Sequence, residues 1–401
     1  MKILWVKTDF LHPTNRGGQI RTLEMLRCLH RNHEIHYVAF ETPGQPEGLQ
    51  RSVEYCTKAY PVQHHIPPKP SLGFLMQVAR GVISPLPVAV ERYRSEAMRR
   101  QIEELLGKES FDACVADFIF PGINIADPAR WIVFQHNLET MIWKRHATHG
   151  NALRRWFFGL QASRMARFEA DLCRRARRVI AVSETDAREL EKMFQLPPVG
   201  WVPTGVDVRY FSPSQETSHE AVKADLVFVG SMDWMANQDG VGWFLDQILP
   251  LIRRKHPQCT VSIVGRNPNA DLLRRAQSDP LIKVTGTVPD VRPYLWGAAV
   301  SIVPLRIGSG TRLKIFEAMA AKAPVVSTTI GAEGLPLTHG KDVLIADTPE
   351  DFAQRCVDLL SDRSAGQRMA GEAWRLVSGQ FSWESVSRHF ETLLSGVPAA
   401  G

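Results

Sequence analysis

The chain has 401 residues, of which 44% are hydrophobic and 22% charged, which suits a globular protein of two or three domains. Its formal net charge of +6 favours an anionic ligand or an anionic membrane surface, whereas no basic run alternates with aromatic residues as in nucleic-acid-binding proteins. The six cysteines are scattered without a CxxC pair, so they disfavour a zinc site and indicate small buried side chains in a reducing compartment.

The N-terminal run Met1–Val6 resembles a short strand and lacks the apolar stretch and cleavage site of a signal peptide. The longest apolar region, 72–90, is interrupted by Arg80, Pro85 and Pro87, which disfavours a membrane-spanning helix. We therefore expect a cytoplasmic protein.

Short apolar runs alternate with helical patterns along the first half of the chain. Ile3–Val6, a helical pattern in Ile20–His30 and the run Ile35–Phe40 together predict a βαβ unit. Further strand-like runs are Ala113–Ala116, Trp131–Phe134 and Val179–Val182. Because these runs are apolar on both faces, they predict strands of a parallel sheet that is covered by helices on both sides.

Two loops of this half end predicted strands with residues that could bind a ligand. Gly17 and Gly18 could contact a phosphate or an acceptor through their N–H groups, and an ordinary strand-to-helix turn is the alternative. The second loop carries His136, Asn137 and Glu139. His136 could transfer a proton or orient a sugar because imidazole titrates near neutrality, and a structural histidine is the alternative.

Arginine and aromatic residues cluster between Arg154 and Arg178. The arginines are Arg154, Arg155, Arg164, Arg167, Arg174, Arg175, Arg177 and Arg178. The pattern predicts either a basic amphipathic helix on an anionic membrane or a helix that packs its aromatic residues into the core.

The segment Val202–Asp207 and the polar stretch Ser212–Lys223 indicate a domain boundary. Six strand-like runs follow: Leu226–Val229, Val261–Val264, Ile282–Val284, Val300–Val303, Val325–Val326 and Val343–Ile345. Helical patterns separate them, so the sequence predicts two doubly wound α/β domains. Ligands are expected at the carboxyl ends of the strands, in a cleft between the two sheets.

The segment after Val300–Val303 carries the strongest indication of chemistry. A strand leads into glycine and serine, and a helix then begins with Arg312 and Lys314 in its first turn. Cations are unfavourable at a helix N-terminus, so their placement indicates an anionic ligand, most simply a diphosphate. The loop consists of Gly308, Ser309, Gly310 and Thr311.

Glu317 follows Lys314 by three residues and therefore shares its helix face. A carboxylate beside a phosphate site is suited to accept hydrogen bonds from ribose hydroxyls. A surface pair between Lys314 and Glu317 behind a glycine turn is the structural alternative.

Other residues at strand ends of the second half could line the same cleft or simply be solvated loop residues. These are Gly230, Ser231, Asn237, Arg266 and Val288, the last of which could frame a nucleobase. The sequence contains no Asp-x-Asp pair and no cluster with metal-ligand spacing. We therefore expect no cofactor and no metal, with protein groups neutralising the diphosphate.

Together these segments resemble the family-4 retaining glycosyltransferases, of the group 1 type, which have the GT-B fold. The resemblance runs from Met1 to about Gly396. Its most specific part is Phe316–Ala320, Ala323–Thr328 and Gly331–Leu335. Other parts are Gly17-Gly18, His136-Asn137, Val202–Asp207, Gly230, Gly265 and Gly286 with Asp290.

The resemblance implies two Rossmann-like domains facing across a cleft. Residues 1–205 would form the acceptor side, 206–378 would bind a nucleotide-diphosphate sugar, and a helix in 379–401 would cross back to the first domain. A sugar would pass to a saccharide or lipid-linked acceptor in cell-surface polysaccharide or glycolipid synthesis, in the cytoplasm or at the inner face of the membrane.

The resemblance also implies roles for particular residues. Arg312 and Lys314 would face the diphosphate, Gly18 would close over it, Glu317 would hold the ribose, and His136 would lie near the transferred sugar. These roles would make His136, Arg312 and Lys314 the catalytic residues.

The chain departs from the family pattern at two places. Ser309 stands where the family often has a second glutamate, and Ser231 and Asn237 stand near the expected arginine and lysine. Arg312 and Lys314 could substitute for the missing cations. Two alternatives stay open: a nucleotide-sugar epimerase or hydrolase on the same fold, and a nucleotide-sugar-binding protein without catalysis.

Overall fold

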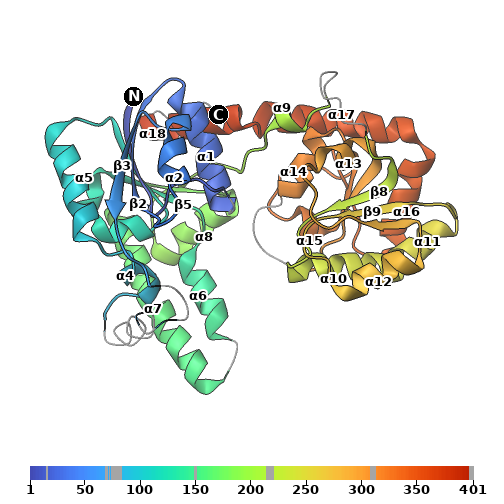
Figure 1. Cartoon of the computed structure of the whole chain (residues 1–401), viewed down its shortest axis with the longest axis horizontal. Helices are drawn as coiled ribbons and strands as arrows, with labels where there is room; N and C mark the ends of the chain where they lie inside the picture. Colours follow the sequence, from blue (N-terminus) through green and yellow to red (C-terminus); the bar gives the residue numbers. More distant parts are fainter. Residues whose placement is uncertain are drawn as a thin grey trace. The chain divides into compact units, whose positions relative to one another are not determined.

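The structure is a computed structural model that describes residues 1–14, 17–67, 71, 73, 84–148, 151–213, 221–307 and 313–396. The chain folds into two compact units, one made of Met1–Pro203 with the segment from Val386, and one made of Thr204–Ser385 (Figure 1). The family resemblance implies a boundary at 205 and a crossing helix that starts at 379. In the structure the last helix, α18 (Trp383–Ser395), joins the first unit from Val386.

The first unit contains a seven-stranded parallel sheet in the order β3-β2-β1-β4-β5-β6-β7. Every residue of β4 and β5 is buried, which explains why their sequences are apolar without alternation. The strands are β1 (Lys2–Val6), β2 (Glu34–Glu41), β3 (Lys58–Gln63), β4 (Ala113–Asp117), β5 (Trp131–Gln135), β6 (Arg178–Ala181) and β7 (Gly200–Trp201).

Helices cover this sheet, and side-chain caps begin several of them, as Ser95 does for α5 and Ser183 for α8. Phe390 of α18 packs its ring 5.7 Å from that of Trp5 and 5.0 Å from that of Phe134, so the C-terminal helix completes the core of the first unit. The longer helices are α1 (Gly17–His30), α5 (Glu96–Lys108), α6 (Glu139–Ala147), α7 (Ala152–Arg175) and α8 (Glu184–Phe194). The short ones are α2 (Glu47–Gln50), η1 (Arg51–Glu54), α4 (Val88–Glu91), η2 (Phe120–Asn124) and η3 (Pro128–Arg130).

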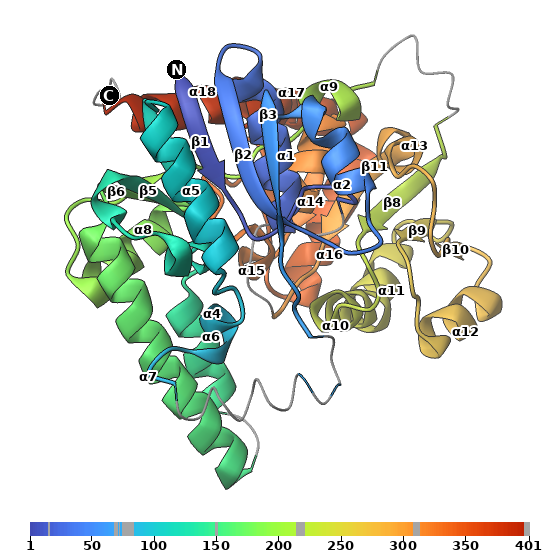
Figure 2. The same cartoon turned by 60° about the vertical axis from the view of Figure 1, so that its left-hand side comes forward.

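The basic segment forms α7, and its second half packs against the first unit. Gln161, Arg164 and Glu169 are buried, and Arg174 Nε donates a hydrogen bond to the carbonyl oxygen of Phe194 at 3.0 Å. One face of this part of the helix packs on the unit, whereas Arg167, Arg174, Arg175 and Arg177 are exposed, so the membrane contact of 154–178 stays a prediction. Only the first turns of α7, with the end of α6, extend beyond the sheet of their unit (Figures 1 and 2).

The second unit contains a six-stranded parallel sheet in the order β10-β9-β8-β11-β12-β13. Each strand lies on one of the six predicted runs, which confirms the predicted doubly wound α/β architecture. The strands are β8 (Ala224–Val229), β9 (Val261–Val264), β10 (Ile282–Val284), β11 (Ala298–Val303), β12 (Val325–Ser327) and β13 (Leu344–Ile345).

The helices of the second unit pack on both faces of its sheet, and two hydrophobic clusters divide the core between them. They are α9 (Val208–Phe211), α10 (Met235–Trp243), η4 (Phe244–Ile248), α11 (Leu249–Arg253), α12 (Ala270–Ser278), α13 (Arg292–Gly297), α14 (Leu313–Ala320), α15 (Thr329–Ala332), α16 (Pro349–Ser361) and α17 (Arg363–Gln380). None of the helices in the described parts of the chain has the length and hydrophobicity that a membrane span requires.

Candidate functional site

Both sheets reverse their strand order once, between β1 and β4 in the first unit and between β8 and β11 in the second. Connections leave such a point in opposite directions, so a crevice forms outside the carboxyl ends of the two strands. The residues that follow these four strands therefore form the candidate site of each unit.

Asp117 ends β4 at the centre of a buried polar cluster in the first unit. Its carboxylate accepts hydrogen bonds from Trp5 Nε1 at 3.0 Å and Thr22 Oγ1 at 2.7 Å. The Nζ atom of Lys7, which follows β1, lies 3.0 Å from Asp117 Oδ1. Burial alone would raise the pKa of Asp117, but the charges of Lys7 and His136 and these hydrogen bonds hold it well below its usual value.

His136 follows β5, and its Nε2 atom lies 2.8 Å from Asp117 Oδ1. Burial lowers the pKa of His136 to about 4, and the charge of Lys7 acts in the same direction, against that of Asp117. The imidazole is therefore neutral at pH 7, with its Nε2 atom facing the Asp117 carboxylate.

The other ring nitrogen, Nδ1 of His136, is buried, and the described residues offer it no hydrogen bond. A Cβ atom on Gly18 would lie 3.6 Å from Nδ1 and 2.9 Å from Cζ of Phe118, so only glycine allows α1 to come this close. Phe118 stacks on the imidazole at 4.0 Å and adopts a φ of 69°, which is uncommon for a bulky residue. A buried acceptor without a partner at the end of a strand is a candidate contact for a ligand hydroxyl.

Glu139 begins α6 behind His136, and its Oε1 atom accepts a hydrogen bond from Asn137 Nδ2 at 3.4 Å. Glu169 of α7 accepts hydrogen bonds from the backbone N–H groups of Glu139 at 3.1 Å and Thr140 at 2.8 Å, so it caps α6. Burial and the charge of Glu169 raise the pKa of Glu139 to about 7. Gly17, by contrast, begins α1 where an added Cβ would meet nothing within 4 Å.

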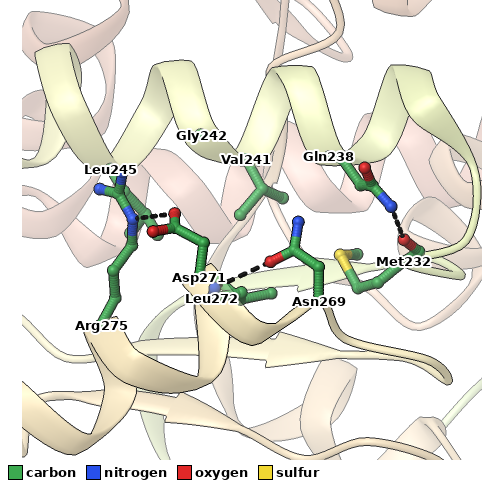
Figure 3. Close-up of a pocket in the computed structure, with 9 residues that line it drawn as sticks. All are labelled: Met232, Gln238, Val241, Gly242, Leu245, Asn269, Asp271, Leu272 and Arg275. Atoms are coloured by element: carbon green, nitrogen blue, oxygen red, sulfur yellow. Dashed lines mark hydrogen bonds and ion pairs between the residues drawn. The ribbon is translucent and has the colours of Figure 1, made fainter.

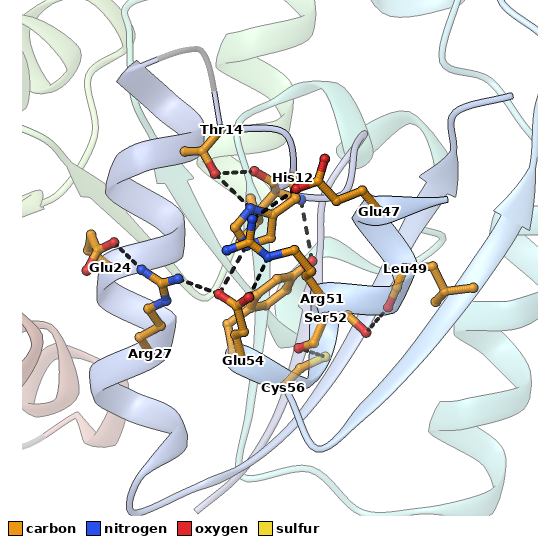
Figure 4. Close-up of polar contacts among 12 residues, drawn as sticks. His12, Thr14, Glu24, Arg27, Glu47, Leu49, Arg51, Ser52, Glu54 and Cys56 are labelled. Carbon is orange, nitrogen blue, oxygen red and sulfur yellow. Dashed lines mark hydrogen bonds and ion pairs between the residues drawn. The ribbon is translucent and has the colours of Figure 1, made fainter. Parts of the chain in front are cut away.

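A second polar cluster connects the loop after β1 to α1 and η1 (Figure 4). Glu54 lies at its centre, with Arg51 Nε at 2.6 Å, His12 Nε2 at 3.3 Å, and the guanidinium of Arg27 in contact. The hydrogen bond from Arg51 lowers the pKa of Glu54 to about 2, with further contributions from Arg27 and His12. These contacts hold the loop that leads toward Gly17.

In the second unit Lys314 lies where β8 and β11 end. Its Nζ atom donates a hydrogen bond to Asn237 Oδ1 at 2.8 Å and lies 4.4 Å from the centroid of the Phe228 ring. A Cβ atom on Gly230 would be 2.8 Å from Lys314 Nζ and 2.9 Å from Asn237 Nδ2. The structure thus brings together Gly230, Asn237 and Lys314, three of the residues predicted from the sequence.

Glu317 lies one turn after Lys314 on α14 and is half-buried. Burial raises its pKa, while the charge of Lys314 acts in the opposite direction. The predicted residues Gly308, Ser309, Gly310, Thr311 and Arg312 lie outside the described residues.

Three other predicted residues of the second unit make contacts of their own. Arg266 Nε donates a hydrogen bond to Ser231 Oγ at 2.9 Å and lies 3.5 Å from the carboxylate of Asp233. Val288 is half-buried and packs on the hydrophobic core. Arg266 therefore has an anionic partner within the protein, the carboxylate of Asp233.

A small cavity of the second unit lies between α10 and α12 (Figure 3). Gln238 Nε2 donates a hydrogen bond to the carbonyl oxygen of Met232 at 2.5 Å, and Arg275 Nε donates one to Asp271 at 2.8 Å. Because these polar groups pair with one another, the cavity is a packing defect between two helices.

Sequence reasoning missed Lys7, Asp117 and Glu169. Each of the first two is a charged residue at the carboxyl end of an apolar run, and that position is the signal that could have identified them.

Two family models match the chain. "Glycosyltransferase Family 4" matches residues 15–210, and "Glycosyl transferases group 1" matches residues 223–362. An uncharacterized 44.6 kDa protein in the cps region of Klebsiella pneumoniae is 22% identical over 399 residues, which cover 96% of this chain and 97% of the relative. O-antigen chain mannosyltransferase B of Escherichia coli is 27% identical over 233 residues, which cover 53% of this chain and 58% of the relative.

Two solved structures share the fold. Sucrose-phosphate synthase from Thermosynechococcus elongatus has a TM-score of 0.68 at 15% identity, covering 100% of both chains. Anabaena Alr3699/HepE in complex with UDP and glucose has a TM-score of 0.62 at 14% identity, covering 99% of this chain and 100% of the other. At these identities the likeness shows the arrangement of the chain and nothing about its ligand.

Proposed function

The chain belongs to the family-4, group 1 glycosyltransferases and has their GT-B fold, and we propose that it transfers a sugar from a nucleotide-diphosphate sugar to a hydroxyl acceptor with retention of configuration. The observation that carries the proposal is the contact of Lys314 with Asn237 beside Gly230, at the point where the second sheet reverses its strand order. Relatives that act in O-antigen synthesis, such as the Escherichia coli mannosyltransferase, support a polysaccharide or glycolipid product.

The diphosphate of the donor would lie against Lys314 and the backbone at Gly230. Gly230 has no side chain to hinder close approach, and the ammonium group lies within hydrogen-bonding reach of that space. The N-terminus of α14 would add backbone N–H groups, and Arg312, outside the described residues, would add a second cation. These groups would stabilise the charge that develops on the leaving diphosphate.

We propose that no metal takes part in the reaction. Lys314 and Arg312 would supply the positive charge at the diphosphate. Among the described residues, the cluster with metal-ligand geometry is Glu34, His36 and Glu109, and Lys2 lies within salt-bridge distance of both of its carboxylates. Glu34 begins β2, so this cluster lies at the edge of the sheet opposite to the carboxyl ends.

His136 would orient a sugar rather than transfer a proton. A neutral imidazole with a pKa of about 4 is a weak base at pH 7, but its Nδ1 atom can accept a hydrogen bond from a sugar hydroxyl. Asn137 and Glu139 would support this position, and Glu317 would accept hydrogen bonds from the ribose.

A panel of nucleotide-sugars tested by thermal shift would identify the donor, because a ligand that binds the folded protein raises its apparent stability. The identified donor is then incubated with and without an acceptor extract, and with a chelator. We expect a glycosylated product of unchanged anomeric configuration that forms only with acceptor and at the same rate with chelator. Donor turnover without acceptor would indicate an epimerase or hydrolase, and binding without nucleotide release would indicate a non-catalytic protein.

We also propose that the protein works in the cytoplasm, at the inner face of the membrane where lipid-linked acceptors are found. The mild positive charge of the chain supports this location.

A further inference from the structure

Helices α6 and α7 form a hairpin whose far end projects from the first unit (Figures 1 and 2). We call the described residues of this end, 144–148 and 151–158, the hairpin tip. The two helices pack along each other, so the tip is held on a rigid support instead of a loose loop. Phe158 contributes to that support, because its ring lies 5.8 Å from that of Trp143 and 5.4 Å from that of His146.

Two large apolar side chains of the tip are turned away from the hairpin. Leu153 is 72% exposed and Trp156 is 57% exposed. They are three residues apart on α7, so they share one face of the helix. Exposed apolar side chains that lie together at a projecting end indicate a surface that binds something apolar.

The charges around these two residues are all positive. No aspartate or glutamate occurs between Glu139 and Glu169 in the sequence. The cations at the tip are Lys144, Arg145, Arg154 and Arg155, and all four are exposed. Exposed cations close in sequence to an exposed leucine and tryptophan complement a surface that is anionic outside and apolar beneath.

A lipid bilayer with anionic headgroups has this combination of properties. Tryptophan favours the boundary between headgroups and acyl chains, and arginine and lysine bind lipid phosphates there. A protein partner would need carboxylates placed around an apolar pocket to fit the same projecting end. The bilayer requires only a planar surface, so it is the simpler complement of a convex tip.

We propose that the hairpin tip is a membrane-docking element. Leu153 and Trp156 enter the headgroup region of an anionic bilayer, while Lys144, Arg145, Arg154 and Arg155 contact lipid phosphates. This inference rests on the proposed function in one respect: a lipid-linked acceptor would explain why the protein binds a membrane. It narrows the predicted membrane contact from the whole of α7 to the tip, where the exposed apolar side chains lie.

Co-sedimentation of the full chain with phosphatidylcholine vesicles, with or without phosphatidylglycerol, tests the proposal. We expect binding to the anionic vesicles that weakens with added salt. Each cation near an anionic surface strengthens membrane binding about fivefold. The double variant Arg154→Gln with Arg155→Gln should therefore lower the partition coefficient roughly 25-fold. Leu153→Ser with Trp156→Ser should lower it at least about tenfold, because the apolar contact with the bilayer is lost.

Matched controls lie elsewhere on the first unit. Val53 is 74% exposed, and Arg188 has a side chain that is 75% exposed, so Val53→Ser with Arg188→Gln removes the same kinds of group away from the tip. This control should bind as the parent does. All variants should keep the parent's thermal unfolding midpoint, because the side chains changed are in solvent.

Three results would overturn the proposal: equal binding to neutral vesicles, no binding to either kind, or binding that the tip variants leave unchanged. The tip variants should keep the parent's turnover with a water-soluble acceptor. A parent chain that docks but transfers no sugar would contradict the proposed function and leave the docking inference intact.

Discussion

The buried pair of Lys7 and Asp117 gives a prediction whose size follows from the structure. The two side chains are 2% and 0% exposed, and their charged atoms lie 3.0 Å apart. Asp117→Asn leaves the ammonium group of Lys7 buried without its counter-charge, with the ring of Phe118 at 4.4 Å. Removing one partner of such a pair typically costs about 3–5 kcal/mol of the free energy of unfolding, which is the loss we expect.

Lys7→Met should cost less, on the order of 2 kcal/mol, because two hydrogen-bond donors still bind the remaining carboxylate. These donors are Trp5 Nε1 and Thr22 Oγ1. In the double variant neither charge is left alone, so its loss should be smaller than the sum of the two single losses.

Urea unfolding measures these losses, and the transition of the second unit serves as the internal control. NMR titration of His136 gives an independent measurement. The charge of Lys7 lowers the pKa of His136 and that of Asp117 raises it, so Lys7→Met should raise this pKa and Asp117→Asn should lower it. Equal and additive losses, or a pKa that moves in the same direction in both variants, would refute the reasoning.

Three further predictions concern the donor site, a titrating carboxyl group and a backbone contact. Lys314→Ala should lower turnover at saturating donor at least about tenfold in a sugar-transfer assay, whereas Lys341→Ala, which removes an exposed lysine of the same unit, should not. Burial raises the pKa of Glu139 from 4.5 to about 7. Its ionisation therefore lowers the free energy of unfolding as the pH rises above the unfolded-state pKa of 4.5. Glu139→Gln should therefore stabilise the protein by about 3 kcal/mol at pH 8 and by nothing near pH 4, as urea unfolding at the two pH values would show. Gly265→Ala would place a Cβ atom 1.9 Å from a backbone carbonyl oxygen, and we expect a loss of more than about 2 kcal/mol in chemical unfolding. Gly242→Ala, which meets nothing within 4 Å, should be neutral or slightly stabilising.

The sequence predicted both parallel sheets because their central strands are buried on both faces. Runs such as Trp131–Phe134 have no polar alternation, and every residue of β5 is buried. The same logic predicted that Gly230 could line the same cleft as Lys314, since both follow strands of one sheet.

The buried cluster of the first unit could not be predicted in the same way. Lys7 and Asp117 are far apart in the sequence, and their contact depends on β1 pairing with β4. Strand-like runs show that strands exist, but several strand orders satisfy the same runs. An order in which β1 and β4 are not neighbours would separate the two charges.

The arginine-rich helix shows a different limit. Arginine and aromatic residues occur all around 154–178, so helical periodicity does not tell which face is packed. Arg164 is buried whereas Arg154 is exposed, and Glu169 is buried because it caps α6. The elements that a helix face packs against determine which of its side chains are buried, and these elements are known only from the tertiary structure.

The two units place a lysine in a similar way at their strand-order reversals, but the side chains beside the two lysines differ. Lys7 lies 4.4 Å from the centroid of Phe118 and Lys314 lies 4.4 Å from that of Phe228. A carboxylate lies beside the first lysine, whereas the amide oxygen of Asn237 accepts a hydrogen bond from the second.

Asn237→Asp would give the second site the chemistry of the first. The new carboxylate would pair with Lys314 at the distance of the present hydrogen bond, 2.8 Å, and would repel a diphosphate. We expect donor affinity to fall at least about tenfold in calorimetric titration, since each tenfold corresponds to about 1.4 kcal/mol and charge-assisted hydrogen bonds contribute about that much. Asn237→Ser, which adds no charge, is the matched control. Equal affinity in the aspartate and serine variants would mean that Lys314 does not bind the donor through its charge.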